Sequence, residues 1–230
     1  MRTKDYLLLL ETATTNCSVA ISLNGQIVQH VEKADEKYSH SDYLHRFIVE
    51  AMEAASIPFS KLAGVVVSKG PGSYTGLRIG VATAKGICYA HDIPLLAINT
   101  LDVLAQSYSP KEGDILVPMI DARRMEVFTK VLDHQYVTLR PTTAEIITEG
   151  FLENMPKGRK IIFGTGAEKC KPLLQGDNVH FLDDVVLPSA KHMVDLATKK
   201  FKQDSFENVA YFEPYYLKEF YSNTAKLSQI

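Results

Sequence analysis

The sequence predicts an α/β protein made of two similar halves, each a mixed β-sheet flanked by helices. Short apolar runs alternate with amphipathic stretches along most of the chain. The order β-β-β-α-β-α occurs twice, at an offset of about a hundred residues. A length of 230 residues suits one large domain or two small ones. We expect the second half to be the reduced one, because its periodic pattern is weaker.

The first half begins with strands. Apolar runs at 6–11 and 18–23 predict two of them, and Asn24-Gly25 predicts a tight turn into a third. A helix is expected next, at 39–58, because Pro58 ends its periodic pattern. The rest of this half is predicted as a strand at 61–70, a helix at 73–92, a strand at 93–99 and a helix at 100–108 capped by Thr100.

The second half restarts after Pro110 with an apolar run that ends at Asp121, just as the first strand of the first half ends at Glu11. The remaining elements are predicted as a returning strand that completes 114–132, a third strand at 136–145, a helix at 143–156, and a strand, glycine turn and helix within 158–174. The chain is therefore divided into an N-terminal subdomain at 1–108, a reduced C-terminal subdomain at 109–217 and a tail at 218–230.

Charge and cysteine content argue against several classes of protein. The formal net charge is −2 and no basic block stands out, which is unlike a protein that binds nucleic acid by itself. The four leucines before Glu11 are too short a run for a signal peptide or a membrane span, so we expect a cytoplasmic protein without a membrane partner. Cys17, Cys88 and Cys170 are far apart in sequence, as expected for buried reduced thiols rather than a disulfide framework.

A glycine-rich stretch, SKGPGSYTGLRIG at 68–80, joins an apolar strand to a helix. It lacks the P-loop pattern, because Leu77 and Arg78 follow Gly76, and the dinucleotide pattern, because Gly76 comes one residue late. The stretch still leads into a helix N-terminus, where amide groups favour anions. Candidate nucleotide or anion contacts come from this turn and from the ends of the first strands: Glu11, Gly70, Gly72, Ser73, Asp121 and Arg123.

The helices at 39–58 and 73–92 have apolar arcs wider than one neighbour requires. Gly76 and Gly80 lie four residues apart, and each glycine within a helix costs about 1 kcal/mol relative to alanine, which close packing would offset. One side of each helix should pack on its own sheet. The other side is left either for a partner protein or for the second half of the chain. The expected partner interface consists of Tyr43, Leu44, Phe47, Ile48, Ala51, Gly76, Gly80, Thr83 and Ile87.

The sequence contains no recognisable catalytic motif. His40 and His45 are five residues apart, which places them on different faces of a helix, and GxSxG, HExxH and CxxC patterns are absent. The cluster of Asp121, Arg123 and Arg124 is either a clamp for a carboxylate or phosphate or a solvated turn with an internal ion pair. We therefore predict no catalytic residue and no metal site.

Duplicated β-β-β-α-β-α units also build actin, Hsp70 and the sugar kinases, in which a nucleotide lies between the halves. Fold alone does not decide function. On this analogy, the alternative function for the chain is an ATP-dependent kinase or ATPase that uses Glu11 and Asp121.

Five stretches resemble, in the same order, the bacterial TsaB (YeaZ) proteins: LLLLETATTNCSVAI, GPGSYTGLRIG, INTLDVLA, DARRMEVF and EPYYLKE. Together they span most of the chain, and GPGSYTGLRIG is the most specific of them. Glu11 stands where relatives commonly carry aspartate, and Tyr74 where they usually carry phenylalanine. The resemblance implies an actin-like ATPase (RNase H-like) fold related to the glycoproteases.

The resemblance also implies a function. TsaB proteins take part in making threonylcarbamoyladenosine, a modified base beside the anticodon of certain tRNAs. They are regarded as non-catalytic: a TsaD subunit carries the metal and transfers the group, and a TsaE ATPase joins the pair. The family's pairing surface falls on the helices at 41–56 and 74–90.

For this chain the resemblance thus implies a scaffold subunit that pairs with TsaD-like and TsaE-like proteins. It is expected to form a homodimer when alone, to contact tRNA only indirectly and to have no protease activity. No tightly bound cofactor is expected, and ATP or ADP is the candidate ligand at the subunit junction.

Overall fold

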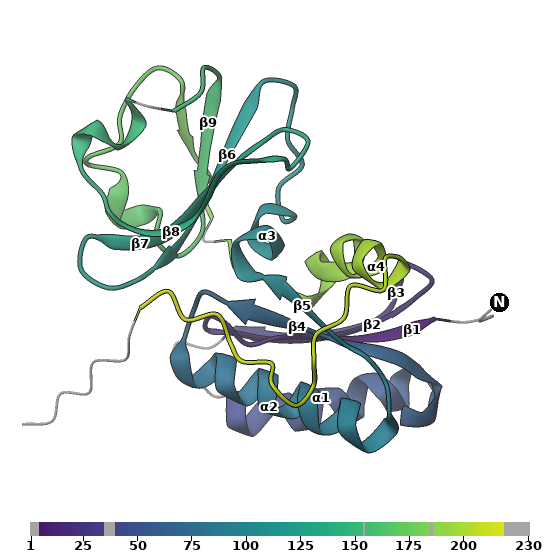
Figure 1. The fold of residues 1–230 in the computed structure, drawn as a ribbon. Coiled ribbons are helices and arrows are strands. Elements are labelled where there is room, and N and C mark those ends of the chain that lie inside the picture. Colours follow the sequence, from purple (N-terminus) through teal and green to yellow (C-terminus); the bar gives the residue numbers. More distant parts are fainter. Residues whose placement is uncertain (1–4, 35–39, 154, 185, 219–230) are drawn as a thin grey trace, which may run out of the picture.

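A computed structural model describes residues 5–34, 40–153, 155–184 and 186–218 of the chain. Two mixed sheets lie one above the other, as Figure 1 shows, with helices on both faces of the first sheet. None of the helices in the described residues is both long and apolar enough to cross a membrane.

The first sheet has the strand order β3-β2-β1-β4-β5. Its strands are β1 (Tyr6–Glu11), β2 (Asn16–Leu23), β3 (Gln26–Ala34), β4 (Leu62–Gly70) and β5 (Leu95–Asn99). Strand β1 reads as an unbroken leucine run because both of its faces are covered. Leu8 and Leu10 face the core under the two long helices, whereas Leu7 and Leu9 face the core on the opposite side of the sheet.

The second sheet has the order β10-β9-β6-β7-β8, which repeats the arrangement of the first. Its strands are β6 (Asp114–Asp121), β7 (Glu126–Asp133), β8 (Thr138–Ile146), β9 (Arg159–Phe163) and β10 (Val179–Phe181). In both sheets the first strand pairs antiparallel with the second and parallel with the fourth. The expected actin-like architecture, with two duplicated units and a reduced second one, is confirmed.

Helices α1 (His40–Ala54) and α2 (Tyr74–His91) cover the face of the first sheet that points away from the second half (Figure 1). The short helix α3 (Thr100–Ala105) lies between the two sheets. Its cap differs from the prediction: the Asn99 side chain accepts a hydrogen bond from the Leu101 amide at 2.9 Å. Thr100 is instead the first helical residue, and its hydroxyl bonds the Ser68 hydroxyl at 2.8 Å.

Both helices predicted for the second half are wrong. Residues 143–146 continue strand β8, in which Thr143 pairs with Thr129 and Ile146 with Glu126. After this strand the chain forms only a 3₁₀ turn at Glu149–Leu152, and a second 3₁₀ turn at Glu168–Cys170 replaces the helix expected after β9. Cross-strand pairing therefore overrides the local helical pattern. The β-branched residues at 142–148 also favour a strand over a helix.

A C-terminal helix that we did not predict, α4 (Val194–Lys202), returns to the first sheet after the 3₁₀ turn η4 (Ala190–Met193). Met193, Val194 and Ala197 pack there with Leu7 and Leu9, on the face opposite α1 and α2. The range 109–217, expected for the second subdomain, thus includes helix α4, which packs against the first sheet.

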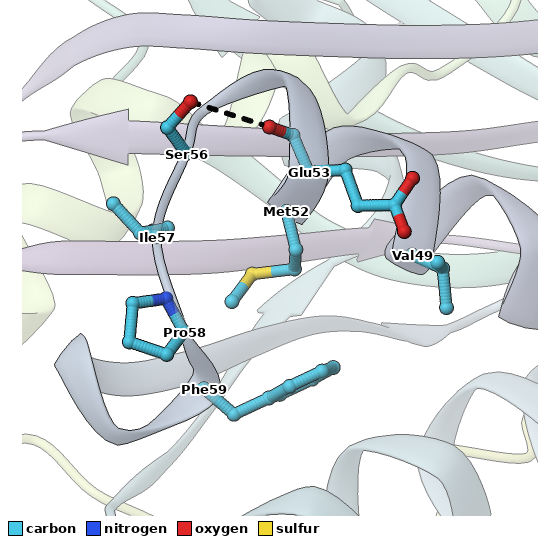
Figure 2. Close-up of a pocket in the computed structure, with 7 residues that line it drawn as sticks. All are labelled: Val49, Met52, Glu53, Ser56, Ile57, Pro58 and Phe59. Carbon is cyan, nitrogen blue, oxygen red and sulfur yellow. Dashed lines mark hydrogen bonds between the residues drawn. The ribbon is translucent and has the colours of Figure 1, made fainter.

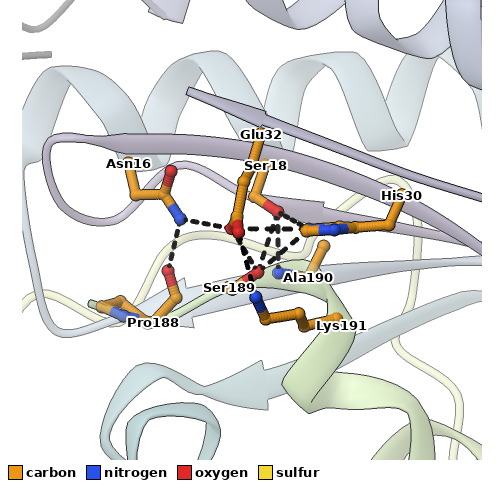
Figure 3. Close-up of polar contacts among 8 residues, drawn as sticks. All are labelled: Asn16, Ser18, His30, Glu32, Pro188, Ser189, Ala190 and Lys191. Atoms are coloured by element: carbon orange, nitrogen blue, oxygen red, sulfur yellow. Dashed lines mark hydrogen bonds and ion pairs between the residues drawn. The ribbon is translucent and has the colours of Figure 1, made fainter. Parts of the chain in front are cut away.

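A polar cluster around Glu32 holds this returning segment to the edge of the first sheet (Figure 3). One Glu32 oxygen accepts from the Ser189 hydroxyl at 2.7 Å and from the Asn16 side-chain Nδ2 at 3.0 Å, and the other accepts from Lys191 Nζ at 3.0 Å. Burial opposes ionisation of Glu32, but these hydrogen bonds outweigh it and lower the pKa of the carboxyl to about 2. We call these residues the Glu32 cluster.

The last described residues, 206–218, form an extended segment that we call the C-terminal strap. It crosses α2 and ends between α2 and the second sheet (Figure 1). The Glu207 amide donates to the Leu95 carbonyl at the edge of the first sheet, and Lys85 Nζ donates to the carbonyls of Ala210 and Phe212. At its far end, Leu217 packs into the core of the second half. The strap therefore contacts both halves.

Candidate functional site: a docking face and a glycine-rich turn

An apolar groove runs along the outer side of the first half, between α1 and α2. Its volume is about 650 Å³. It is lined by Ser41, His45, Ile48, Val49, Phe59, Ile79, Ala82, Thr83, Gly86 and Ile87. A smaller pocket of about 350 Å³, drawn in Figure 2, adjoins the end of α1. Val49 and Phe59 line both hollows, so the groove and the pocket form one apolar surface.

The described residues of the second sheet and its loops do not cover this surface, because α1 and α2 lie on the face of the first sheet that points away from them (Figure 1). The strap covers only the flank of α2, where Val209 and Phe212 pack against the core below the helices. Of the two alternatives left open by the apolar arcs, coverage by the second half is therefore wrong.

The residues expected at the partner interface divide into two groups. Thr83 and Ile87 line the groove. Ile48 also lines it, although this side chain is almost entirely buried. Leu44, Phe47 and Ala51 are buried against the sheet, and Tyr43 is partly buried, with its hydroxyl accepting a hydrogen bond from Lys33 Nζ at 2.8 Å. The wide apolar arc of α1 is thus mostly used inside the chain.

Gly76 and Gly80 are also turned inward, contrary to their expected place at the interface. A Cβ atom on Gly76 would overlap the Thr12 carbonyl oxygen, and one on Gly80 would overlap the Thr12 hydroxyl. The Thr12 hydroxyl donates to the Gly76 carbonyl at 2.8 Å. The close packing that the glycines predicted does exist, but its neighbour is the turn between β1 and β2 of the same chain.

The sequence reasoning found Thr83 and Ile87 but missed Ile79, Ala82 and Gly86, which complete the helix stripe that lines the groove. Ile79, Ala82, Thr83, Gly86 and Ile87 are spaced i, i+3, i+4, i+7 and i+8, which is the spacing of one helix face. Gly86 differs from the other helical glycines because a Cβ atom there would meet no neighbour within 4 Å. This stripe could have been found by testing both apolar faces of the helix.

The glycine-rich turn uses three of its backbone amides within the chain. The Ser73 amide donates to the Ala13 carbonyl at 2.7 Å, the Gly76 amide to the Ser73 hydroxyl at 3.3 Å, and the Leu77 amide to the Ser73 carbonyl at 2.9 Å. Ser73 is therefore the helix cap. A Cβ atom on Gly72 would overlap the Ala13 carbonyl oxygen. The turn packs on the β1–β2 connection and does not present these amides to an anion.

The strap closes the other side of the turn. Gly70 has φ = 112°, a conformation that side chains rarely adopt, and the Tyr215 amide donates to the neighbouring Lys69 carbonyl at 2.7 Å. A Cβ atom on Gly70 would overlap the Tyr215 carbonyl oxygen. Glycine is required at position 70 because the strap backbone lies against it.

The two acids at the strand ends have opposite surroundings. Glu11 is fully buried; its Oε1 atom accepts from the Ala13 amide at 2.7 Å, and its Oε2 atom has no hydrogen-bond partner among the described residues. Burial raises the pKa of Glu11 to about 7, although the Ala13 amide opposes the shift. Asp121 is exposed, pairs with Lys169, and accepts from the Arg123 amide at 2.9 Å. These two carboxylates do not line a common open cleft, which argues against the kinase alternative.

Other candidate groups are structural. Cys17, Cys88 and Cys170 are buried free thiols, as expected, and burial raises the pKa of Cys17 to about 12 and of Cys88 to about 11. Within the described ranges, no group of three or more histidine, cysteine or acidic side chains is arranged to hold a metal ion.

Comparison with known proteins places this geometry in a family. The profile of the TsaD family, described as tRNA N6-adenosine threonylcarbamoyltransferase, matches residues 26–221. The TsaB protein of Escherichia coli, described as a tRNA threonylcarbamoyladenosine biosynthesis protein, is 27% identical over 219 residues, covering 92% of this chain and 94% of that protein. A TsaB protein of Buchnera aphidicola, described in the same words, is 33% identical over 198 residues, covering 83% and 91%.

The fold is shared with a solved relative. YeaZ from Pseudomonas aeruginosa superposes on the chain with a TM-score of 0.78 at 23% identity, covering 93% of this chain and 100% of that one. Together with the profile match over most of the sequence, these relatives show that the chain belongs to the TsaD family and, within it, to the TsaB (YeaZ) group.

Proposed function

We propose that the chain is a non-catalytic scaffold subunit of the cytoplasmic machinery that makes threonylcarbamoyladenosine in tRNA. The observation that carries this proposal is the open apolar surface between α1 and α2. Val49 is 49% exposed there, and Phe59, Ile79 and Ile87 are partly exposed beside it. A continuous apolar groove of this kind is typical of a surface that another protein covers.

The proposed main partner is a TsaD-like catalytic subunit, with a TsaE-like ATPase joining the pair. The family match supports a partner of the same fold, and related chains commonly pair through equivalent patches. The same reasoning makes a homodimer the proposed state of the chain alone, because an isologous interface uses one patch twice. In this proposal the transfer of the threonylcarbamoyl group takes place on the partner.

Nucleotide, as ATP or ADP, is proposed to bind at the subunit junction and not tightly within this chain. In support, the amides of Ser73, Gly76 and Leu77 donate to acceptors inside the chain, and the strap lies against Gly70. Glu11 is enclosed, so it does not reach a ligand in the cleft.

The docking proposal is tested by filling the groove from Gly86. Arginine at this position should not disturb the isolated chain, because a Cβ atom there would meet no neighbour within 4 Å. Replacing glycine should also favour the helix, since glycine is a weaker helix former by about 1 kcal/mol. We expect Gly86→Arg to abolish co-purification with the organism's TsaD-like protein while the melting temperature is unchanged or higher. Gly80 is unsuitable for this test because arginine there would collide with Thr12 inside the chain.

The matched control is Tyr89→Arg, which places the same cation on the same helix outside the groove, at a side chain that is 86% exposed. This variant should co-purify normally. Retention of the partner at full stoichiometry by Gly86→Arg would show that docking takes place elsewhere.

A further inference from the structure

The turn between β6 and β7 holds two arginines in an unfavourable backbone conformation. Arg123 has φ = 73° and Arg124 has φ = 49°. Positive φ is uncommon for residues other than glycine, because a Cβ atom is strained there, and here it occurs at two adjacent arginines. We call residues 122–125 the arginine turn. Strain retained at adjacent positions points to a use for the two side chains.

The backbone of the arginine turn is held firmly. The Arg123 amide donates to Asp121 at 2.9 Å, the Glu126 amide donates to the Arg123 carbonyl at 3.1 Å, and Lys169 Nζ donates to the Arg124 carbonyl at 2.6 Å. Both arginine side chains, by contrast, are exposed, and neither guanidinium forms a hydrogen bond or ion pair with any described residue. The turn therefore presents two unpaired cations on a rigid support.

The end of the strap adjoins this turn, and its aromatic side chains lie in turn against α2. Lys218, at the end of the strap, pairs with Glu126, the residue that follows the turn. Two residues earlier, the Tyr216 ring lies 4.9 Å from the ring of Tyr74, over which Arg78 is placed at 5.4 Å. Tyr215 and Tyr216 are 39% and 38% exposed.

The carboxylates in this region leave the surface basic. Asp121 forms an ion pair with Lys169, and Glu126 forms one with Lys218. Glu213, which lies close to Tyr216, forms no ion pair with a described residue. Arg78, Arg123 and Arg124 carry charges that no described carboxylate neutralises. This local excess contrasts with the formal net charge of −2 for the whole chain.

We propose that the arginine turn and the adjoining tyrosines bind a single-stranded stretch of RNA. Guanidinium groups bind phosphate oxygens in a bidentate manner, and exposed tyrosine rings stack on unpaired bases. The combination favours RNA over an acidic protein, which would use the cations but not the rings. This proposal rests on the proposed function in one respect, the choice of RNA as the polyanion. It replaces the indirect contact with tRNA expected from the sequence with a direct contact.

The test measures fluorescence anisotropy of a short fluorescein-labelled single-stranded RNA with the full chain. Arg123→Gly/Arg124→Gly removes both cations and relieves the strained backbone, so the variant should fold at least as well. We expect its affinity to fall about tenfold or more, and the slope of log K against log salt to decrease by about 1.4, or about 0.7 for each lost phosphate contact. Tyr216→Leu, which keeps an apolar side chain but removes the ring, should weaken binding about fivefold.

The matched control is Lys199→Ala/Lys202→Ala, which removes two exposed cations from α4 and should change affinity less than twofold. The proposal is overturned if the unmodified chain does not bind at low salt, if the double-glycine variant binds as well as the unmodified chain, or if the α4 control loses as much. Competition by poly-glutamate as strong as by RNA, with Tyr216→Leu unaffected, would assign the surface to an acidic protein and also overturn it. Co-purification with the TsaD-like protein should survive in Arg123→Gly/Arg124→Gly, so failure here is distinct from failure of the docking proposal.

Discussion

The glycines of this chain have different roles, which depend on the atoms that surround each of them. Gly76 and Gly80 are required because Thr12 occupies the space of a side chain, and Gly70 because the strap lies against it. Gly86 has no such neighbour, and its lack of a side chain leaves the groove open. Glycine spacing predicts that something approaches closely, but it does not say which backbone approaches.

Glu11 should make the stability of the chain depend on pH. Its pKa is raised by burial from 4.5 to about 7, so the folded state binds the proton more tightly than the unfolded state. The associated stability is therefore fully present below about pH 4.5 and is lost as the pH rises through about 7. Glu11→Gln should remove this dependence and raise the free energy of unfolding at pH 8 by up to about 3 kcal/mol, with no gain at pH 4.

Urea unfolding of both proteins between pH 4 and pH 8 measures this effect. Glu112→Gln, an exposed carboxyl in the same background, is the control and should follow the unmodified chain. Parallel stability profiles for Glu11→Gln and the unmodified chain would mean that Glu11 is already ionised at neutral pH.

Among the elements, α4 shows how a distant segment completes the first sheet. Together with the preceding turn η4, it supplies buried side chains that pack with Leu7 and Leu9 on the side that α1 and α2 do not cover. Apolar contact accounts for the packing, and the Glu32 cluster orients the residues that enter the helix (Figure 3). Ser189 and Lys191 bond Glu32, while the Ala190 amide donates to the Ser18 hydroxyl at 3.1 Å.

Glu32→Gln should therefore loosen α4. The glutamine side chain keeps one acceptor oxygen, which can still accept from Ser189 and Asn16, but its NH2 group cannot accept from Lys191 Nζ and the negative charge is lost. Hydrogen bonds to a charged group contribute about 1.5–3 kcal/mol. We expect a loss of about 1–3 kcal/mol in the free energy of unfolding at pH 7 and faster hydrogen exchange at 190–202. Because the pKa of Glu32 is lowered, this contribution is present above about pH 4.5 and is lost as the pH falls through about 2.

Glu145→Gln is the control for this experiment. Its ion pair with Arg140 is 3.7 Å long and lies at the surface of β8, where such pairs contribute about 1 kcal/mol or less. Unchanged exchange at 190–202 in Glu32→Gln would show that apolar packing alone holds α4.

At the scale of the whole molecule, the strap is a further link between the two halves, in addition to the segments of chain that run from one sheet to the other. It bonds Lys69 in the first half through Tyr215, and reaches the second half through Leu217 and Lys218. It also covers the glycine-rich turn at Gly70. The relative position of the halves and the closure of the turn therefore depend on the same short segment.

Removal of residues 213–230 should loosen this junction. We expect faster hydrogen exchange at 68–73 and a melting temperature lower by about 2–4 °C for each kcal/mol lost, with exchange in β2 and β3 unchanged. The matched truncation, which removes only 219–230, leaves every strap contact named above and should behave as the full chain. Equal protection of 68–73 in both truncated chains would contradict the role assigned to the strap.

Much of the fold could be predicted from local pattern. The leucine run of β1, the Asn24-Gly25 turn and the long periodic stretches of α1 and α2 have the structure they predict. Prediction failed where a partner strand competed with a helical pattern, as at 143–146, and where a short helix such as α4 depends on packing. For the site, an open groove lies between the two predicted helices, but most of the side chains predicted on α1 face inward.

The sequence by itself determined which segments are strands or long helices and that the strand order is duplicated, because hydrophobic period and turn chemistry act over a few residues. Only the tertiary structure decided which face of α2 remains open, that Glu11 is enclosed, and that the arginine turn adjoins the tyrosines of the strap. These facts depend on contacts between residues far apart in the sequence, such as Tyr215 with Lys69, and local patterns carry no information about such pairs.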